Sequence, residues 1–223
     1  MGALARDRFE RQSGLVPTDR LQSTWATVIG CGSIGRQLAL QLTALGVPKL
    51  QLIDFDDVGR TNITSQGFLT DDVGRPKVEA VGDSCHQLEH QLDLETIRDR
   101  YRPTHKIAPI VFCAVDSITV RATIWRSVQQ RCEFWGDGRM LGENLRILVA
   151  DAEPARRHYA QTMFPQRESQ VGACTSHATI YAANLAAALL VHQFTRHLRG
   201  LALDVDATFN LLAGEYVVAP VTA

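Results

Sequence analysis

A glycine-rich turn between an apolar segment and an amphipathic helix constrains this chain more than any other feature. The turn, GCGSIG at residues 30–35, directly follows the short apolar run of residues 26–29, which predicts a buried strand. The apolar positions of the helix predicted next are Ile34, Leu38, Leu42 and Leu45. A second apolar run, residues 50–53, ends at Asp54. Strand, glycine turn, helix and strand in this order predict a nucleotide-binding unit.

The three glycines of this turn have different roles. Gly30 allows the tight turn, Gly32 lets the backbone approach a phosphate group, and Gly35 lets the helix pack close to the strand. The helix N-terminus adds unpaired N–H groups and a partial positive charge. Asp54 can accept hydrogen bonds from ribose hydroxyls. This spacing fits a nicotinamide dinucleotide almost as well as ATP, so the rest of the chain has to decide between them.

Size and composition predict one domain that works on a small molecule or a protein. With 223 residues, 45% of them hydrophobic, we expect a single domain over residues 1–223. A net charge of -1 and no long basic run argue against a surface built mainly for nucleic acid or anionic membrane. The longest apolar stretch, residues 185–191, is far shorter than a bilayer span. Scattered cysteines without a Cys-x-x-Cys pair, and no signal-peptide pattern, lead us to expect a cytoplasmic protein.

The order of predicted elements indicates an α/β fold with a Rossmann-like, doubly wound sheet. We expect this sheet to be mainly parallel, with antiparallel strands in the C-terminal part. Further strands are predicted at residues 92–97, 109–115, 133–136 and 145–150, with two more between 204 and 218, and further helices at residues 117–130 and 177–198. Residues 1–22 are predicted to form a surface-lying arm, and residues 151–173 a long loop before the last helix.

Two charged residues lie where a nucleotide would need them. Lys77 falls in the first turn of the helix that Pro76 opens, where a cation opposes the helix dipole, as expected of a residue kept for an anion. Asp116 follows the buried strand at residues 109–115. Because ligands lie outside the carboxyl ends of strands in open parallel sheets, we expect Asp116 to share one crevice with Gly30 and Asp54. Asp116 can also serve as an N-cap, and the two roles are compatible.

Six motifs occur in a fixed order along the first part of the chain. They are Arg11-Gln12, GCGSIG at residues 30–35, DFDDV at residues 54–58, Thr61-Asn62-Ile63 with Gln66, DVGRPK at residues 72–77, and Ala114-Val115-Asp116 with Arg121. In this order they resemble the ubiquitin-like-protein activating family of ThiF, MoeB and HesA type. The resemblance is close from Arg11 to about Arg126 and looser over the rest of the chain.

The resemblance implies adenylation of the C-terminal carboxylate of a small ubiquitin-like or sulfur-carrier protein, with ATP and Mg²⁺. In that family the glycine turn lies against the nucleotide, the residue matching Asp54 holds the ribose, and those matching Lys77 and Arg11 contact phosphates. The residue matching Asp116 serves magnesium. Further nucleotide-binding positions are Asp56, Asn62 and Gln66. The arginine at the position of Arg11 typically comes from a second subunit, so a homodimer is implied.

The chain departs from the family pattern in two places. The usual Asn-Leu-x-Arg-Gln sequence is replaced by residues 62–66, NITSQ, so Ser65 stands where a phosphate-binding arginine is expected. Arg60 and Arg75 are the candidates to take its place. The paired Cys-x-x-Cys motifs that hold a structural zinc in many relatives are missing, so no such zinc is expected.

Cys174 directly precedes the predicted last helix, where backbone N–H groups and the helix dipole favour a thiolate. In activating enzymes a cysteine in this region, often followed by threonine as in Cys174-Thr175, takes the adenylated carboxyl as a thioester. The carrier then passes to a conjugating enzyme or reacts with a sulfur donor. The alternative is a small buried residue at a helix start. Other functions also stay open: adenylation of a peptide in natural-product or cofactor synthesis, a nicotinamide-dependent oxidoreductase, and a nucleotide-binding scaffold without catalysis.

Overall fold

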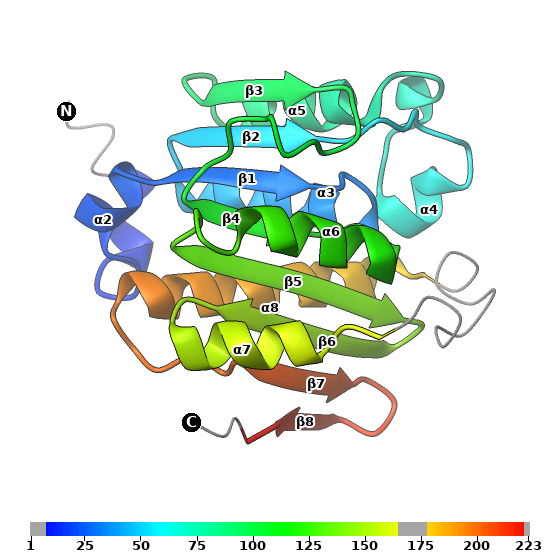
Figure 1. Ribbon diagram of the computed structural model, residues 1–223. Helices are drawn as coiled ribbons and strands as arrows, with labels where there is room; N and C mark the ends of the chain where they lie inside the picture. Colours follow the sequence, from blue (N-terminus) through cyan, green and yellow to red (C-terminus); the bar gives the residue numbers. More distant parts are fainter. Residues whose placement is uncertain (1–7, 165–177, 221–223) are drawn as a thin grey trace.

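Eight strands form one mixed sheet in the computed structural model, which describes residues 8–164 and 178–220 (Figure 1). The strands are β1 Trp25–Ile29, β2 Lys49–Ile53, β3 Asp93–Ile97, β4 Ile110–Cys113, β5 Phe134–Leu141, β6 Asn144–Ala150, β7 Asp206–Asn210 and β8 Glu215–Val218. Their order in the sheet is β3-β2-β1-β4-β5-β6-β7-β8. The first five are parallel, and β5 to β8 pair antiparallel. The predicted fold class is therefore confirmed.

Helices cover both faces of the sheet. They are η1 Glu10–Gln12, α2 Thr18–Gln22, α3 Ser33–Leu45, α4 Asn62–Gln66, η2 Thr70–Asp72, α5 Lys77–Leu88, α6 Ile118–Val128, α7 Glu153–Gln161 and α8 Ile180–Leu198. Helices α3, α5 and α8 cover one face, and α6 and α7 cover the other (Figure 1). No helix in the described ranges is long and apolar enough to cross a membrane.

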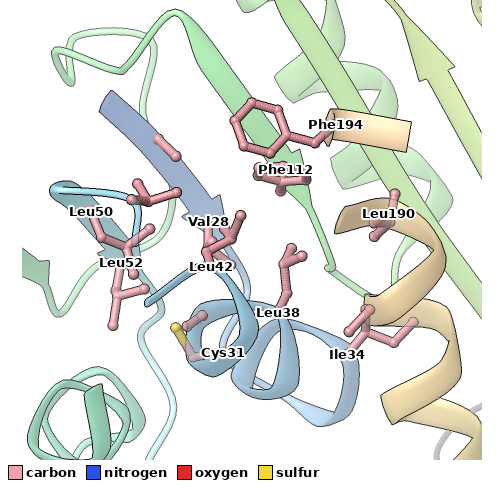
Figure 2. Packing of buried hydrophobic residues seen from close by; sticks show 14 of the residues in the cluster. Val28, Cys31, Ile34, Leu38, Leu42, Leu50, Leu52, Phe112, Leu190 and Phe194 are labelled. Carbon is pink, nitrogen blue, oxygen red and sulfur yellow. The ribbon is translucent and has the colours of Figure 1, made fainter. Parts of the chain in front are cut away.

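The larger hydrophobic cluster fixes α3 against the sheet and against α8. Leu38 and Leu42 of α3 are fully buried and point toward Val28 of β1, and Leu190 and Phe194 of α8 close the cluster (Figure 2). The helix ends at Gly46, whose φ of +106° is the left-handed conformation that glycine adopts readily. The predicted strand, turn, helix and strand unit is confirmed, and its packing holds the glycine turn in place.

The smaller cluster lies under α6 and α7. Three aromatic rings meet there: the centroids of Trp125 and Tyr159 are 4.7 Å apart, and those of Trp125 and Trp135 are 5.3 Å apart. Each of these residues is at most 2% exposed. Because they come from α6, α7 and β5, this cluster fastens both helices to the sheet.

One prediction about irregular segments was wrong, and another needs a qualification. The loop expected over residues 151–173 contains helix α7, whose first turn includes Pro154. Proline is tolerated there because its missing N–H would be unpaired in any case, and Ala155 and Tyr159, one turn apart, bury the inner face. The arm expected to lie on the surface is partly packed, since Val16 and Leu21 are buried in the larger cluster.

Candidate functional site

The glycine turn joins β1 to α3 and leaves open space beside Gly32. Gly30 has a φ of +92°, and a Cβ atom there would lie 2.8 Å from the backbone oxygen of Ala114, so position 30 requires glycine. A Cβ atom at Gly35 would overlap the backbone of Gly30. A Cβ atom at Gly32 would meet nothing closer than 3.9 Å, the side-chain oxygen of Gln66. Packing within the chain therefore does not require glycine at position 32, whereas a phosphate group lying against this backbone would.

Helix α3 begins without a side-chain cap. Gly32 is the N-cap residue and offers no side chain to the first N–H groups, and the first turn contains no acidic residue. The N-terminal N–H groups of a helix and its dipole attract anions. The start of α3 can therefore bind a phosphate group beside Gly32.

Asp54 lies at the carboxyl end of β2 and is tied to the glycine turn. Its carboxylate accepts hydrogen bonds from the backbone N–H groups of Cys31 (2.6 Å) and Asp56 (2.8 Å). Burial raises the pKa of Asp54, although the two hydrogen bonds and Lys77 oppose the rise. Asp54 therefore fixes the shape of the turn, a role that we did not predict. Each carboxylate oxygen keeps a second lone pair for a ribose hydroxyl.

Lys77 is the first residue of α5, as predicted, and forms an ion pair with Asp56. Its Nζ atom lies 3.1 Å from the Asp56 carboxylate, and its backbone N–H donates to the Asp56 carbonyl over 2.9 Å. The Lys77 side chain is 9% exposed and that of Asp56 is 47% exposed. The ion pair offsets the unfavourable position of a cation at a helix N-terminus. An ammonium group has three N–H donors, so two are left for phosphate oxygens.

Helix α4 contributes Asn62 and Gln66 beyond the carboxyl ends of β1 and β2 (Figure 1). Asn62 accepts a hydrogen bond from the backbone N–H of Gly59 over 2.8 Å. The buried side-chain oxygen of Gln66 has no hydrogen-bond partner in the described part of the chain. An unpaired buried polar atom is costly, and this one lies near Gly32. A ligand bound at the glycine turn would give it a partner.

The family arginine missing at position 65 is not replaced by Arg75. Ser65 carries no charge and hydrogen-bonds within α4. Arg75 forms ion pairs with Asp72 (3.2 Å) and Asp83 (2.5 Å), which already engage its guanidinium group. Arg60 is exposed and has no ion pair with any described residue. Of the two candidates, Arg60 alone is therefore available for a phosphate.

Asp116 follows β4 beside the glycine turn, because the N–H of Ala114 donates to the carbonyl of Ile29 over 2.8 Å. It is exposed and has no hydrogen bond or ion pair with another described residue. The N-cap of α6 is Ser117, so the predicted capping role for Asp116 was wrong. The described residues contain no cluster of three or more possible metal ligands. Mg²⁺ is usually held by one or two carboxylates with phosphate oxygens and water, so a free carboxylate at this edge fits it.

One predicted site residue, Arg11, is not brought to this edge. Arg11 lies in η1, and the neighbouring Gln12 donates to the carbonyl of Leu45, at the C-terminal end of α3, over 2.8 Å. The 13 residues of α3 span about 20 Å, so Arg11 lies roughly that far from the glycine turn of its own chain. Cys174 lies outside the described residues.

A buried charged cluster behind the site was missed entirely. Asp137 of β5 is fully buried and forms ion pairs with Arg121 of α6 and Arg139 of β5. Tyr159 of α7 donates to the same carboxylate over 2.9 Å. A signal was present in the sequence, because Asp137 and Arg139 occupy alternate positions of an apolar strand and so share one face. Charged residues at such positions are buried in pairs.

Comparison with curated proteins finds adenylyltransferases and a ubiquitin-like modifier-activating enzyme. The chain is 28% identical over 137 residues to an adenylyltransferase and sulfurtransferase MOCS3-1 of Zea mays, which covers 55% of this chain and 29% of that protein. It is 29% identical over 133 residues to a molybdopterin-synthase adenylyltransferase of Haemophilus influenzae, and this match covers 56% of this chain and 54% of that protein. A ubiquitin-like modifier-activating enzyme 5 of Drosophila persimilis is 31% identical over 98 residues, and this match covers 41% of this chain and 26% of that protein. The chain thus matches about half or less of each relative's length.

Comparison with solved structures finds the same fold at low identity. A structure of PaaA matches with a TM-score of 0.79 and 18% identity, covering 99% of this chain and 75% of that one. A structure of Escherichia coli MccB with ATP matches with a TM-score of 0.73 and 18% identity, covering 96% and 71%. The sequence also matches the ThiF family over residues 6–213, nearly its whole length. This chain therefore belongs to the ThiF family.

Proposed function

We propose that this chain is an adenylyltransferase that uses ATP and Mg²⁺ to activate the C-terminal carboxylate of a ubiquitin-like or sulfur-carrier protein in the cytoplasm. The open backbone at Gly32 is the observation that carries the proposal, because a phosphate group explains a glycine that packing does not. Lys77 and Asp116 border the same edge of the sheet. The adenylyltransferase names of the relatives support the same reaction.

The chemistry needs positive charge more than it needs a base. A carboxylate oxygen attacks the α-phosphate, a new O–P bond forms, and the bond to the β-phosphate breaks to release pyrophosphate. The carboxylate is already ionised at neutral pH, so no general base is required. Lys77 and the N-terminus of α3 stabilise the negative charge that gathers on the phosphates. Mg²⁺, held at Asp116, would neutralise further phosphate charge.

A homodimer would complete the site through Arg11. This residue lies about 20 Å from the glycine turn of its own chain, so it can reach a nucleotide only on a partner subunit. Mixing the variants Arg11→Ala and Asp116→Asn tests the arrangement. If Arg11 acts on the partner, a mixed dimer regains one intact site and activity returns. If Arg11 acts within its own chain, every site in the mixture lacks one residue and activity stays lost.

A thioester on Cys174 is the proposed next step. The adenylated carboxyl carbon would be attacked by the Cys174 thiolate, and AMP would leave with the oxygen that bridged carbon and phosphorus. Cys174→Ser should keep adenylation and lose a thiol-sensitive conjugate with the carrier. A conjugate that persists in Cys174→Ser would exclude this step and leave adenylation intact.

Pyrophosphate exchange into ATP, measured with carrier proteins that end in glycine, tests the main proposal. Carrier-dependent exchange should fall at least about hundredfold in Lys77→Met and in Asp116→Asn. Lys49→Met and Asp93→Asn are matched controls, because these residues form an exposed ion pair far from the glycine turn, and they should keep normal exchange. Exchange driven only by short peptides would indicate a peptide substrate. Equal exchange in Lys77→Met and the controls would refute the proposal.

A further inference from the structure

The start of α6 buries fewer of its residues than the second half of the helix. Its N-cap bond, from the N–H of Val120 to the side chain of Ser117, is 3.4 Å long, near the limit for a hydrogen bond. In the first half of the helix only Ile118 and Arg121 are buried, whereas Ile124, Trp125 and Val128 anchor the second half. Arg121 is therefore a buried polar contact between the beginning of α6 and β5.

Arg121 is held by β5 and in turn holds the residue next to Asp116. Its guanidinium donates to the carbonyl of Gly138 over 3.1 Å and pairs with the carboxylate of Asp137. Its backbone N–H donates to the carbonyl of Ser117 over 3.0 Å. A continuous path of short contacts thus runs from Asp137 through Arg121 and Ser117 to Asp116.

The Asp137 carboxylate also organises the other side of the cluster. It accepts from Nε of Arg139 over 2.9 Å, and Arg139 donates to the backbone and side-chain oxygens of Thr162, both over 3.1 Å. Two guanidinium groups therefore share one fully buried carboxylate. Removing its charge leaves two cations facing each other in a buried site, which strongly disfavours their present positions.

We infer that Asp137 is a positioning residue, which holds Arg121 and through it the start of α6, so that Asp116 stays at the nucleotide edge of the sheet. The role given to Asp116 rests on the proposed function. The mechanical part of the inference, that Asp137 holds the start of α6 in place through Arg121, does not. Tyr159, which donates to the same carboxylate, supports Asp137 in this role.

Hydrogen exchange measured by mass spectrometry tests the mechanical part without any assay of activity. In Asp137→Asn, the backbone amides of residues 120–123 should exchange roughly tenfold faster or more than in the unmodified protein. Asp206→Asn is the matched control, because Asp206 is a buried carboxylate of β7 that pairs with Arg146 of β6 and His158 of α7. It should leave these amides unchanged. Equal acceleration in both variants, or none in Asp137→Asn, would overturn the inference.

A milder variant and a magnesium titration complete the test. Tyr159→Phe removes one hydrogen bond and keeps the ring, so it should loosen α6 in the same direction but less, and it serves if Asp137→Asn does not fold. In pyrophosphate exchange, Asp137→Asn should need several-fold more Mg²⁺ for half-maximal rate, with an unchanged KM for the carrier. A normal Mg²⁺ requirement in a variant with a loosened α6 would overturn the link to Asp116. If the unmodified protein shows no pyrophosphate exchange, the proposed function fails, and hydrogen exchange of the backbone amides alone decides whether Asp137 positions α6.

Discussion

Gly35→Ala should lower the stability of the protein, whereas Gly32→Ala should lower its affinity for ATP, although the two positions are only three residues apart in the same turn. A Cβ atom at Gly35 would lie 2.8 Å from the carbonyl carbon of Gly30 and overlap its oxygen, whereas real Cβ atoms essentially never come within 3.0 Å of another atom. Neither partner is the end of a flexible side chain, so the backbone of β1 or α3 must move. Such overpacking costs about 3 kcal/mol or more, which lowers Tm by roughly 6–12 °C in a chain of this size.

At Gly32 the nearest atom to a Cβ would be 3.9 Å away, an ordinary van der Waals contact. Gly32→Ala should therefore change the free energy of unfolding by no more than about 0.5 kcal/mol. The added methyl group would occupy the space proposed for a phosphate. ATP affinity should then fall by roughly tenfold to hundredfold, the equivalent of about 1–3 kcal/mol of steric conflict.

Two assays on the two variants distinguish a glycine required for packing from a glycine required for phosphate binding. Thermal unfolding without nucleotide should separate Gly35→Ala from the unmodified protein, and isothermal titration with ATP should separate Gly32→Ala. Normal ATP affinity in a folded Gly32→Ala protein would refute the idea that the open space beside this residue receives a phosphate. A loss of stability in Gly32→Ala equal to that in Gly35→Ala would show that packing requires both glycines.

Three further perturbations have definite expected outcomes. Ser65→Arg, which restores the family arginine, should raise kcat/KM for ATP roughly tenfold in pyrophosphate exchange, and no gain would show that the position is not used. Leu190→Ala removes a fully buried side chain and should lower the free energy of unfolding by about 2–5 kcal/mol in urea denaturation; a loss below 1 kcal/mol would contradict the packing. Burial raises the pKa of Asp206, but hydrogen bonds from Arg146 and His158 outweigh it and lower the pKa overall. This stabilisation is therefore fully present above an unfolded-state pKa of about 3.9 and is lost as the pH falls from there through the lower folded-state pKa. Asp206→Asn should accordingly reduce Tm most at about pH 7 and progressively less as the pH falls below about 4, and an equal reduction across this range would contradict the sign.

The nucleotide-binding half of the fold could be predicted because its signals are local. The apolar run before Gly30, the helical spacing after it and Asp54 at the next strand end are all read from adjacent residues. Helix α7 gave no such signal, since only Ala155 and Tyr159 of its nine residues are buried. Polar helices held by two residues have no apolar stripe to find.

Contacts between distant residues could not be predicted from one sequence. The carboxylate of Asp54 was expected to face the ribose, but its bond to the N–H of Cys31 depends on how β1 and β2 pair. The ion pair between Arg121 and Asp137 depends on the packing of α6 against β5. Spacing along the chain carries no information about either of these two contacts. Asp116 and Lys77 could be predicted because they belong to motifs whose order along the chain resembles that of a known family.

The fate of the carboxylate oxygen tests the central claim most directly. A carrier or peptide substrate with ¹⁸O in its C-terminal carboxylate would be turned over with ATP, Mg²⁺ and an excess of thiol acceptor. Attack of the carboxylate on the α-phosphate, followed by attack on the acyl carbon, leaves one substrate oxygen in AMP. Adenylation therefore predicts AMP that contains one ¹⁸O atom. Unlabelled AMP, or label found in inorganic phosphate together with ADP, would contradict the proposed function.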